Sequence, residues 1–270
     1  MSRITTCFTE LQSIGKKALI PYLTAGDPNV AATLGLMHAL VANGADLIEL
    51  GFPFSDPSSD GPVIQRAIER SLAKKTTLHS VLEIVRLFRT SNQRTPVVLM
   101  GYLNPVECMG YQKFTDAAVA AGVDGVLLVD MPPEEGHDLQ PILRKAGLET
   151  IYLVAPTSSI KRIESICRQS SGYIYYVSLK GVTGAGNLDV ESVATNLARL
   201  RMYTKLPLGV GFGIRDAESA AQIAKVADAV VVGSALINRI AELQDRDNYT
   251  LAELVQQTTL IADMRKAMDR

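Results

Sequence analysis

Two carboxylates lie close together in the stretch ELGFPFSDPSSDGP, which runs from Glu49 to Pro62. Glu49 interrupts a short apolar run, whereas Asp60 lies in the polar loop that follows. A buried carboxylic acid has a raised pKa and can exchange protons near neutral pH. Two carboxylates in different environments can divide the acid and base roles. The spacing therefore predicts an acid–base site that contains Glu49 and Asp60.

Both carboxylates also have structural interpretations. Glu49 could be paired with a buried Arg or Lys, although neither residue type lies in the central part of any candidate strand. Asp60 precedes Gly61 and Pro62, so it could stabilise a turn or cap the helix expected for PVIQRAIERS. A functional role is favoured for Glu49 because an unpaired buried carboxylate is costly and persists mainly where function requires it.

Glycine-rich stretches follow three late candidate strands, in SLKGVTGAGN, GVGFGIRDAES and VVVGSALINR. Glycine allows close approach of the backbone to an anion, and barrels often bind phosphate at the loops after strands seven and eight. For any one of these glycines, a tight turn is an alternative explanation to phosphate binding. Together the stretches predict a site for a phosphate monoester, formed by Gly213, Gly233 and Ser234 with Gly184 from the preceding loop.

Apolar side chains on the candidate strands predict a slot for a flat ring between the carboxylates and the phosphate site. The residues assigned to it are Tyr22, Met100, Leu127, Tyr175 and Phe212. Each could instead fill the interior of a barrel. A register error of one residue would also turn each side chain to the opposite face.

Eight short apolar runs alternate with amphipathic stretches along the chain, after an additional N-terminal helix around Thr5–Ser13. This alternation over 270 residues predicts a single (β/α)₈ TIM barrel, with residues 1–270 forming one domain. The main competitor is a doubly wound open sheet. The first candidate strand–helix turn, TAGDPN, lacks the GxGxxG pattern that would bind a dinucleotide there, so the barrel is preferred.

The composition excludes several classes of partner. A net charge of -1 gives no general attraction to nucleic acid or anionic lipid, and no run approaches the length of a membrane span. The three cysteines have no CxxC spacing, which is typical of a reducing compartment and predicts a cytoplasmic protein. The histidines form no metal-binding or nucleophile-activating pattern and fall in predicted helices, at His38, His79 and His137.

With these features placed, the chain resembles the alpha subunit of tryptophan synthase over essentially its whole length. The resemblance depends on ELGFPFSDPSSDGPVIQ, with YLTAGDP, GVTGAGN, GFGI and GSA in the expected order. It implies cleavage of indole-3-glycerol phosphate to indole and glyceraldehyde 3-phosphate in tryptophan biosynthesis. It also implies an alpha2-beta2 heterotetramer, in which a partner beta subunit carries pyridoxal phosphate and this chain carries no cofactor.

The same resemblance assigns roles to individual residues. It makes Glu49 and Asp60 the catalytic pair, Tyr175 a substrate-positioning residue, and Thr183 a group that orients Asp60 when its loop closes. Two departures from the family pattern stand out in this sequence. Ser59 replaces an alanine of many relatives, and SLKGVTG has Leu179 and Lys180 where some relatives carry an arginine.

Three other activities fit parts of the sequence. A stand-alone indole-releasing lyase would share the same motifs. Lys180 could form a Schiff base, as in lysine-dependent phosphosugar aldolases, although nothing near it in the sequence would desolvate it. A non-catalytic regulatory subunit would not need both carboxylates.

The loops expected at the mouth contain proline with apolar and acidic residues, a composition that suits an ordered docking surface. Family resemblance indicates that the beta subunit docks on this side. Asp56 and Pro57 are therefore predicted to contact the partner.

Overall fold

The computed structural model describes residues 1–178, 189–211, 213–243, 246 and 248–270. Within these residues, nine parallel strand segments form one sheet, in the order β5-β4-β3-β2-β1-β9-β8-β7-β6. The strands are β1 (Ala18–Thr24), β2 (Ile48–Gly51), β3 (Val97–Gly101), β4 (Gly125–Leu128), β5 (Glu149–Thr150), β6 (Tyr152–Val154), β7 (Ile174–Val177), β8 (Leu208–Gly211) and β9 (Ala229–Val232).

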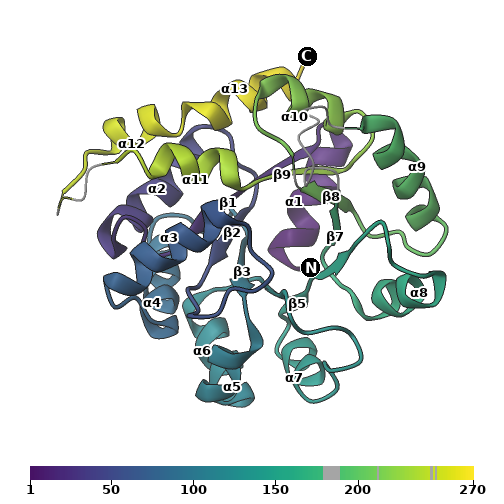
Figure 1. The fold of residues 1–270 in the computed structure, drawn as a ribbon, viewed down its shortest axis with the longest axis horizontal. Coiled ribbons are helices and arrows are strands. Elements are labelled where there is room, and N and C mark those ends of the chain that lie inside the picture. Colours follow the sequence, from purple (N-terminus) through teal and green to yellow (C-terminus); the bar gives the residue numbers. More distant parts are fainter. Residues whose placement is uncertain (179–188, 212, 244–245, 247) are drawn as a thin grey trace.

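The two ends of this sheet, β5 and β6, are separated in the chain by Ile151 alone. β5 pairs with β4, β6 pairs with β7, and the Ile151 N–H donates to Val126 O at 3.0 Å. The sheet therefore closes into a barrel through one interrupted strand. The predicted TIM barrel is confirmed, and its fifth strand is divided into two segments at Ile151 (Figure 1).

Thirteen helices occur in the described residues, and most of them surround the barrel (Figure 1). They are α1 (Arg3–Ser13), α2 (Val30–Ala42), α3 (Pro62–Ala73), α4 (Leu78–Arg89), α5 (Leu103–Met109), α6 (Tyr111–Ala121), α7 (Leu139–Lys145), α8 (Ile160–Gln169), α9 (Val190–Arg201), α10 (Ala217–Ala224), α11 (Ser234–Ile240), α12 (Leu251–Gln257) and α13 (Thr259–Met268). No helix of the described residues is long and apolar enough to cross a membrane.

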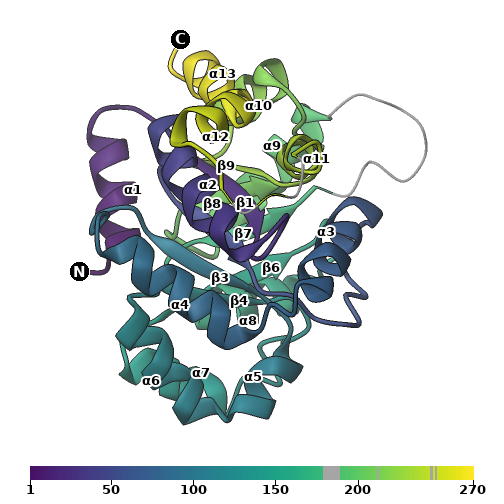
Figure 2. The same cartoon turned by 90° about the vertical axis from the view of Figure 1, so that its left-hand side faces the viewer.

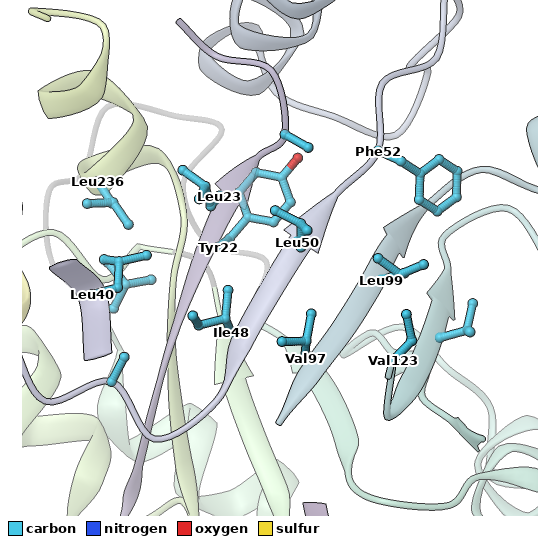
Figure 3. Close-up of a cluster of buried hydrophobic side chains, with 14 of the residues drawn as sticks. Tyr22, Leu23, Leu40, Ile48, Leu50, Phe52, Val97, Leu99, Val123 and Leu236 are labelled. Carbon is cyan, nitrogen blue, oxygen red and sulfur yellow. The ribbon is translucent and has the colours of Figure 1, made fainter. Parts of the chain in front are cut away.

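Alternation along the strands separates two layers of side chains. Residues such as Ile48, Leu50 and Leu99 pack outward against the helices, and Figure 3 shows them side by side on β2 and β3. The intervening residues fill the barrel interior, among them Leu47 and Val98. Because Ile48 and Leu50 face outward, the side chain of Glu49 between them is directed into the barrel.

The additional N-terminal helix is present as α1, two residues longer at its start than the predicted span. Ser2 caps it, since its side chain accepts a hydrogen bond from the Thr5 N–H. Ile4 and Phe8 of this helix belong to the cluster inside the barrel. Figure 2 shows α1 (purple) at one end of the barrel. These two side chains fill the interior at that end.

Candidate active site

A cavity of about 320 Å³ opens at the carboxyl ends of the strands, where active sites of this fold are found. It brings together eight of the residues predicted from the sequence: Tyr22, Glu49, Asp60, Met100, Tyr175, Gly213, Gly233 and Ser234. A larger surface hollow of about 410 Å³ lies beside α1, and none of these eight residues lines it. The mouth cavity is therefore the candidate active site.

Glu49 lies in β2, where its Cα is opposite Tyr22 of β1 and Val98 of β3. Its side chain is fully buried. Oε1 accepts a hydrogen bond of 2.5 Å from the Tyr173 hydroxyl, and Oε2 has no hydrogen-bond partner among the described residues. The sequence alternative of a buried Arg or Lys partner is thus wrong, because a neutral phenol takes that place. Oε2 remains the atom that can reach a ligand.

Burial raises the pKa of Glu49 to about 7, because removal from water disfavours the charged form. The Tyr173 hydrogen bond acts in the opposite direction and limits the increase. A carboxyl group with this pKa is present in both protonation states near neutral pH. It can therefore give and take a proton within one reaction cycle.

Asp60 is half-buried at the end of the loop that joins β2 to α3. Its Oδ2 accepts a hydrogen bond of 2.7 Å from the Tyr102 hydroxyl, which in turn accepts from the Ser59 N–H at 3.0 Å. Burial raises the pKa of Asp60, and the bond from Tyr102 counteracts this. Asp60 does not cap α3, because the capping position is Gly61 and no side chain bonds there. The cap alternative is therefore wrong.

Gln65 of α3 holds the same loop from its other side. Its Nε2 donates to the Asp60 carbonyl at 2.9 Å and to the Pro57 carbonyl at 3.4 Å. Tyr102 binds the Asp60 side chain, whereas Gln65 binds the backbone. Asp60 is thereby fixed at the rim of the cavity.

Two tyrosines cover glycines of neighbouring strands at the mouth. A Cβ on Gly51 would lie 2.2 Å from the Tyr22 hydroxyl oxygen, and one on Gly211 would lie 1.9 Å from that of Tyr175. Such distances are far below van der Waals contact, so both positions require glycine for the rings to lie where they do. The glycines at these strand ends therefore fix the aromatic walls of the cavity.

The part of the rim that follows β8 and β9 is formed by Gly213, Gly233 and Ser234. Gly213 has a φ of 77°, a conformation that glycine adopts without strain. Gly233 precedes α11, so Ser234 begins a helix whose first N–H groups have no partner within the helix. Among the described residues that line the cavity, none is Lys or Arg. An anion at this rim would depend on backbone N–H groups and a hydroxyl.

Several predicted residues lie elsewhere. Leu127 is buried inside the barrel and does not line the cavity, whereas Val129, two residues further along the chain, does. Asp56 is exposed and Pro57 is partly exposed on the loop before Asp60, outside the cavity lining. Five residues named from the sequence lie outside the described residues: Leu179, Lys180, Thr183, Gly184 and Phe212.

Tyr102, Tyr173 and Gln65 are site residues that sequence reasoning missed. Tyr173 is 124 positions from Glu49, and Tyr102 is 42 positions from Asp60. No spacing rule connects residues this far apart in the chain. The only available signal was the group of tyrosines at strand ends. Among the described residues, no group of three or more His, Cys, Asp or Glu could hold a metal ion.

The fold and the cavity at the mouth of the barrel define the chain as a (β/α)₈ barrel with an active-site-like cavity at the carboxyl ends of its strands. The family model described as "Tryptophan synthase alpha chain" matches residues 8–268. The chain belongs to this family.

Two relatives named tryptophan synthase alpha chain match over 100% of this chain. That of Thioalkalivibrio sulfidiphilus is 61% identical, with 100% of its own length covered, and that of Nitrosococcus oceani is 58% identical, with 98% covered. The crystal structure of tryptophan synthase subunit alpha from Legionella pneumophila is 46% identical and has a TM-score of 0.90. That comparison covers 100% of this chain and 99% of the Legionella chain.

Proposed function

We propose that this chain performs the alpha reaction of tryptophan synthase, the retro-aldol cleavage of indole-3-glycerol phosphate to indole and glyceraldehyde 3-phosphate. Family membership over residues 8–268 supports the assignment. The observation that carries it is Glu49, a fully buried carboxyl group at the mouth with a pKa of about 7. This group matches the proton transfers that the cleavage requires.

Glu49 has two tasks in the proposed reaction. Its acid form donates a proton to the indole carbon that bears the side chain, and its carboxylate accepts the proton of the neighbouring side-chain hydroxyl. The bond between the two carbons then breaks. Its electron pair returns to the protonated ring as indole forms, and the carbon that carried the hydroxyl becomes the aldehyde. Oε2 is proposed as the atom that makes both transfers, because it has no partner among the described residues.

Asp60 is proposed to accept a hydrogen bond from the indole N–H. As the ring is protonated, positive charge develops on this nitrogen, and a fixed carboxylate stabilises it. Tyr22, Met100 and Tyr175 line the cavity near both carboxylates and suit a flat apolar ring. Thr183 remains proposed as the residue that orients Asp60 on loop closure.

The phosphate group is proposed to bind at the part of the rim that follows β8 and β9, against Gly213, Gly233 and Ser234, with Gly184 from the preceding loop. The glycine conformations and the start of α11 support this placement. The rim and Glu49 line one cavity, so one substrate can reach both.

The family name, an alpha chain, indicates a beta subunit as partner. We propose an alpha2-beta2 heterotetramer in which pyridoxal phosphate is bound by the beta subunit and this chain carries no cofactor. We also propose that residues 1–270 form one domain, which is supported by pairing of β1 with both β2 and β9. Three free cysteines suit the reducing conditions of the cytoplasm, where we place the protein.

The test is release of indole from indole-3-glycerol phosphate by the purified chain, alone and with a beta subunit. Glu49→Gln removes the titrating group with little change in shape and is expected to lower kcat at least about 100-fold. Glu164→Gln on α8, an exposed position away from the cavity, is the matched control and should keep the wild-type rate. An unchanged kcat for indole release in Glu49→Gln would contradict the proposed function.

The same assay separates the alternatives. A rate that is already maximal without a beta subunit would identify a stand-alone lyase. A covalent adduct at Lys180 after borohydride treatment with substrate would identify a Schiff-base aldolase.

A further inference from the structure

α1 reaches the catalytic carboxyl group through two aromatic rings. Phe8 of α1 is only 8% exposed and belongs to the cluster inside the barrel. Its ring centroid lies 5.9 Å from that of Tyr173, with the ring planes at 45°. This centroid distance falls in the range that interacting aromatic pairs adopt. Phe8 therefore packs against the residue that holds Glu49.

Tyr173 lies between the closed end of the barrel and the mouth. Its ring is fully buried, and its hydroxyl donates to Glu49 Oε1. A Cβ built on Gly209 would lie 3.5 Å from the ring, so this glycine leaves space beside it. Phe8 is the aromatic neighbour of the ring, and the position of the ring determines where its hydroxyl meets the carboxyl group.

We propose that Phe8 is a positioning residue for Glu49: by packing against the Tyr173 ring, it keeps the Tyr173 hydroxyl in hydrogen-bond contact with Oε1. The proposal rests on the proposed role of Glu49 as proton donor and acceptor. It extends the site to the N-terminal helix, at the end of the barrel away from the substrate. α1 then has a function in catalysis as well as in closing the barrel.

The physical basis is packing. Protein interiors are close-packed, so a ring that loses a neighbour can shift into the space left behind. A hydrogen bond weakens steeply with distance and angle, so a small displacement of the Tyr173 ring is enough to disturb it. Weakening this bond removes the interaction that limits the pKa of Glu49. The pKa of Glu49 should therefore rise when Phe8 is shortened.

Other titratable groups around Glu49 are few among the described residues. Tyr22 comes from β1, Tyr175 from β7 and Asp60 from the loop before α3, and burial raises the pKa of all three groups. The two tyrosines stay neutral near pH 7. Asp60 is the one carboxyl group of the three, and burial raises its pKa above the ordinary value. Its titration is therefore followed in the same experiment.

The experiment is a carbon-13 NMR titration of the full chain without substrate, labelled at glutamate and aspartate carboxyl carbons. The Glu49 and Asp60 signals are assigned by their loss in Glu49→Gln and Asp60→Asn. Tyr173→Phe deletes the hydrogen bond and should raise the pKa of Glu49 by about one unit. Phe8→Ala should raise the pKa of Glu49 by about half as much as Tyr173→Phe does. Phe8→Leu, which fills much of the space, should restore most of the wild-type value.

Phe114→Ala is the matched control, because Phe114 is a fully buried phenylalanine of α6 in the outer layer. Phe114→Ala should lower the free energy of unfolding about as much as Phe8→Ala does, and it should leave the pKa of Glu49 unchanged. In the Tyr173→Phe background, Phe8→Leu should cause no further shift.

An unchanged or lowered pKa of Glu49 in Phe8→Ala would overturn the proposal, and so would a full effect of Phe8→Leu in the Tyr173→Phe background. If Phe8→Ala does not fold, Phe8→Val, which leaves more of the space empty than Phe8→Leu does, takes its place, and a pKa of Glu49 identical to wild type in Phe8→Val would overturn the proposal. Because the titration requires no turnover, its outcome is independent of the indole-release assay that tests the proposed function.

Discussion

Glu49 makes the stability of the fold depend on pH. Its pKa is about 7 in the folded chain, against an ordinary value of 4.5. A raised folded-state pKa means that the folded chain binds the proton more tightly than the unfolded chain. The resulting stabilisation is fully present below pH 4.5 and is lost as the pH rises through 7. The difference between the two pKa values corresponds to about 3 kcal/mol of the free energy of unfolding.

Glu49→Gln should therefore be more stable than wild type at pH 8 by up to about 3 kcal/mol, with the gap closing at pH 4.5. The reason is that glutamine has no charge to bury at either pH. Urea unfolding at the two pH values measures the difference. Glu164→Gln serves again as the exposed control. A gap of equal size at both pH values would show that Glu49 does not titrate in this range.

At the scale of single residues, the sequence predicts which carboxylates matter but not what holds them. The position of Glu49 between Ile48 and Leu50 indicates its burial, because alternation places it on the inner face. Its partner Tyr173 is distant in the chain, and only barrel closure brings the two together. In the sequence, Asp60 before Gly61 resembles a helix cap. Rules based on neighbouring residues cannot identify its actual partner, Tyr102, which lies in another strand–helix unit.

At the scale of elements, the loop between β2 and α3 is held on two sides. Tyr102, which follows β3, binds the side chain of Asp60 and the backbone of Ser59. Gln65 of α3 binds the carbonyl groups of Asp60 and Pro57. The loop therefore depends on a neighbouring strand–helix unit as well as on its own helix. The orientation of Asp60 is a property of both units.

Tyr102→Phe should lower kcat/KM for indole release about 10- to 100-fold, because a hydrogen bond to a charged group contributes about 1.5–3 kcal/mol. Steady-state kinetics of the isolated chain provides the measurement. Tyr111→Phe is a matched control, since Tyr111 donates to the exposed Glu107 at 2.8 Å. Equal kinetics in Tyr102→Phe and wild type would mean that Gln65 alone orients the loop.

The order and type of the helices and strands can be predicted from the sequence. How far toward the mouth of the barrel a given strand residue lies cannot. Alternation indicates that Leu127 faces the barrel interior, which it does. It does not indicate whether a residue reaches the mouth, because strand tilt and stagger set the depth of each position. Val129 takes the predicted place of Leu127 in the cavity lining for this reason. The break at Ile151 also has no signal in the run ETIYLVAP.

At the scale of the whole molecule, the proposed catalytic carboxylates and the proposed docking loops share one end of the barrel. Asp56 is exposed, and its carboxylate accepts a hydrogen bond of 2.5 Å from the Ser55 hydroxyl. Its backbone carbonyl accepts from the Ser58 N–H at 2.8 Å. These contacts lie within the loop, so the side chain contributes little to the fold. A partner bound at this loop would lie within a few residues of Asp60.

Asp56→Ala should reduce the stimulation of indole release by a beta subunit about tenfold, as expected for an interface contact of about 1.4 kcal/mol. It should change the free energy of unfolding by no more than about 0.5 kcal/mol, because the residue is exposed. Titration of the beta subunit into the assay and urea unfolding provide the two values. Asp263→Ala on the exposed face of α13 is the control. Parallel losses of stability and of stimulation in Asp56→Ala would contradict the docking role.

The pairing of β1 with β9 has a consequence for biosynthesis. β1 precedes the other strands of the sheet in the chain, yet one of its two neighbours, Ala229–Val232, is made more than 200 residues later. Until then one side of β1 has open N–H and C=O groups, which attract other extended chains. The open edge of β1 therefore persists in the nascent chain until Ala229–Val232 is available to pair with it.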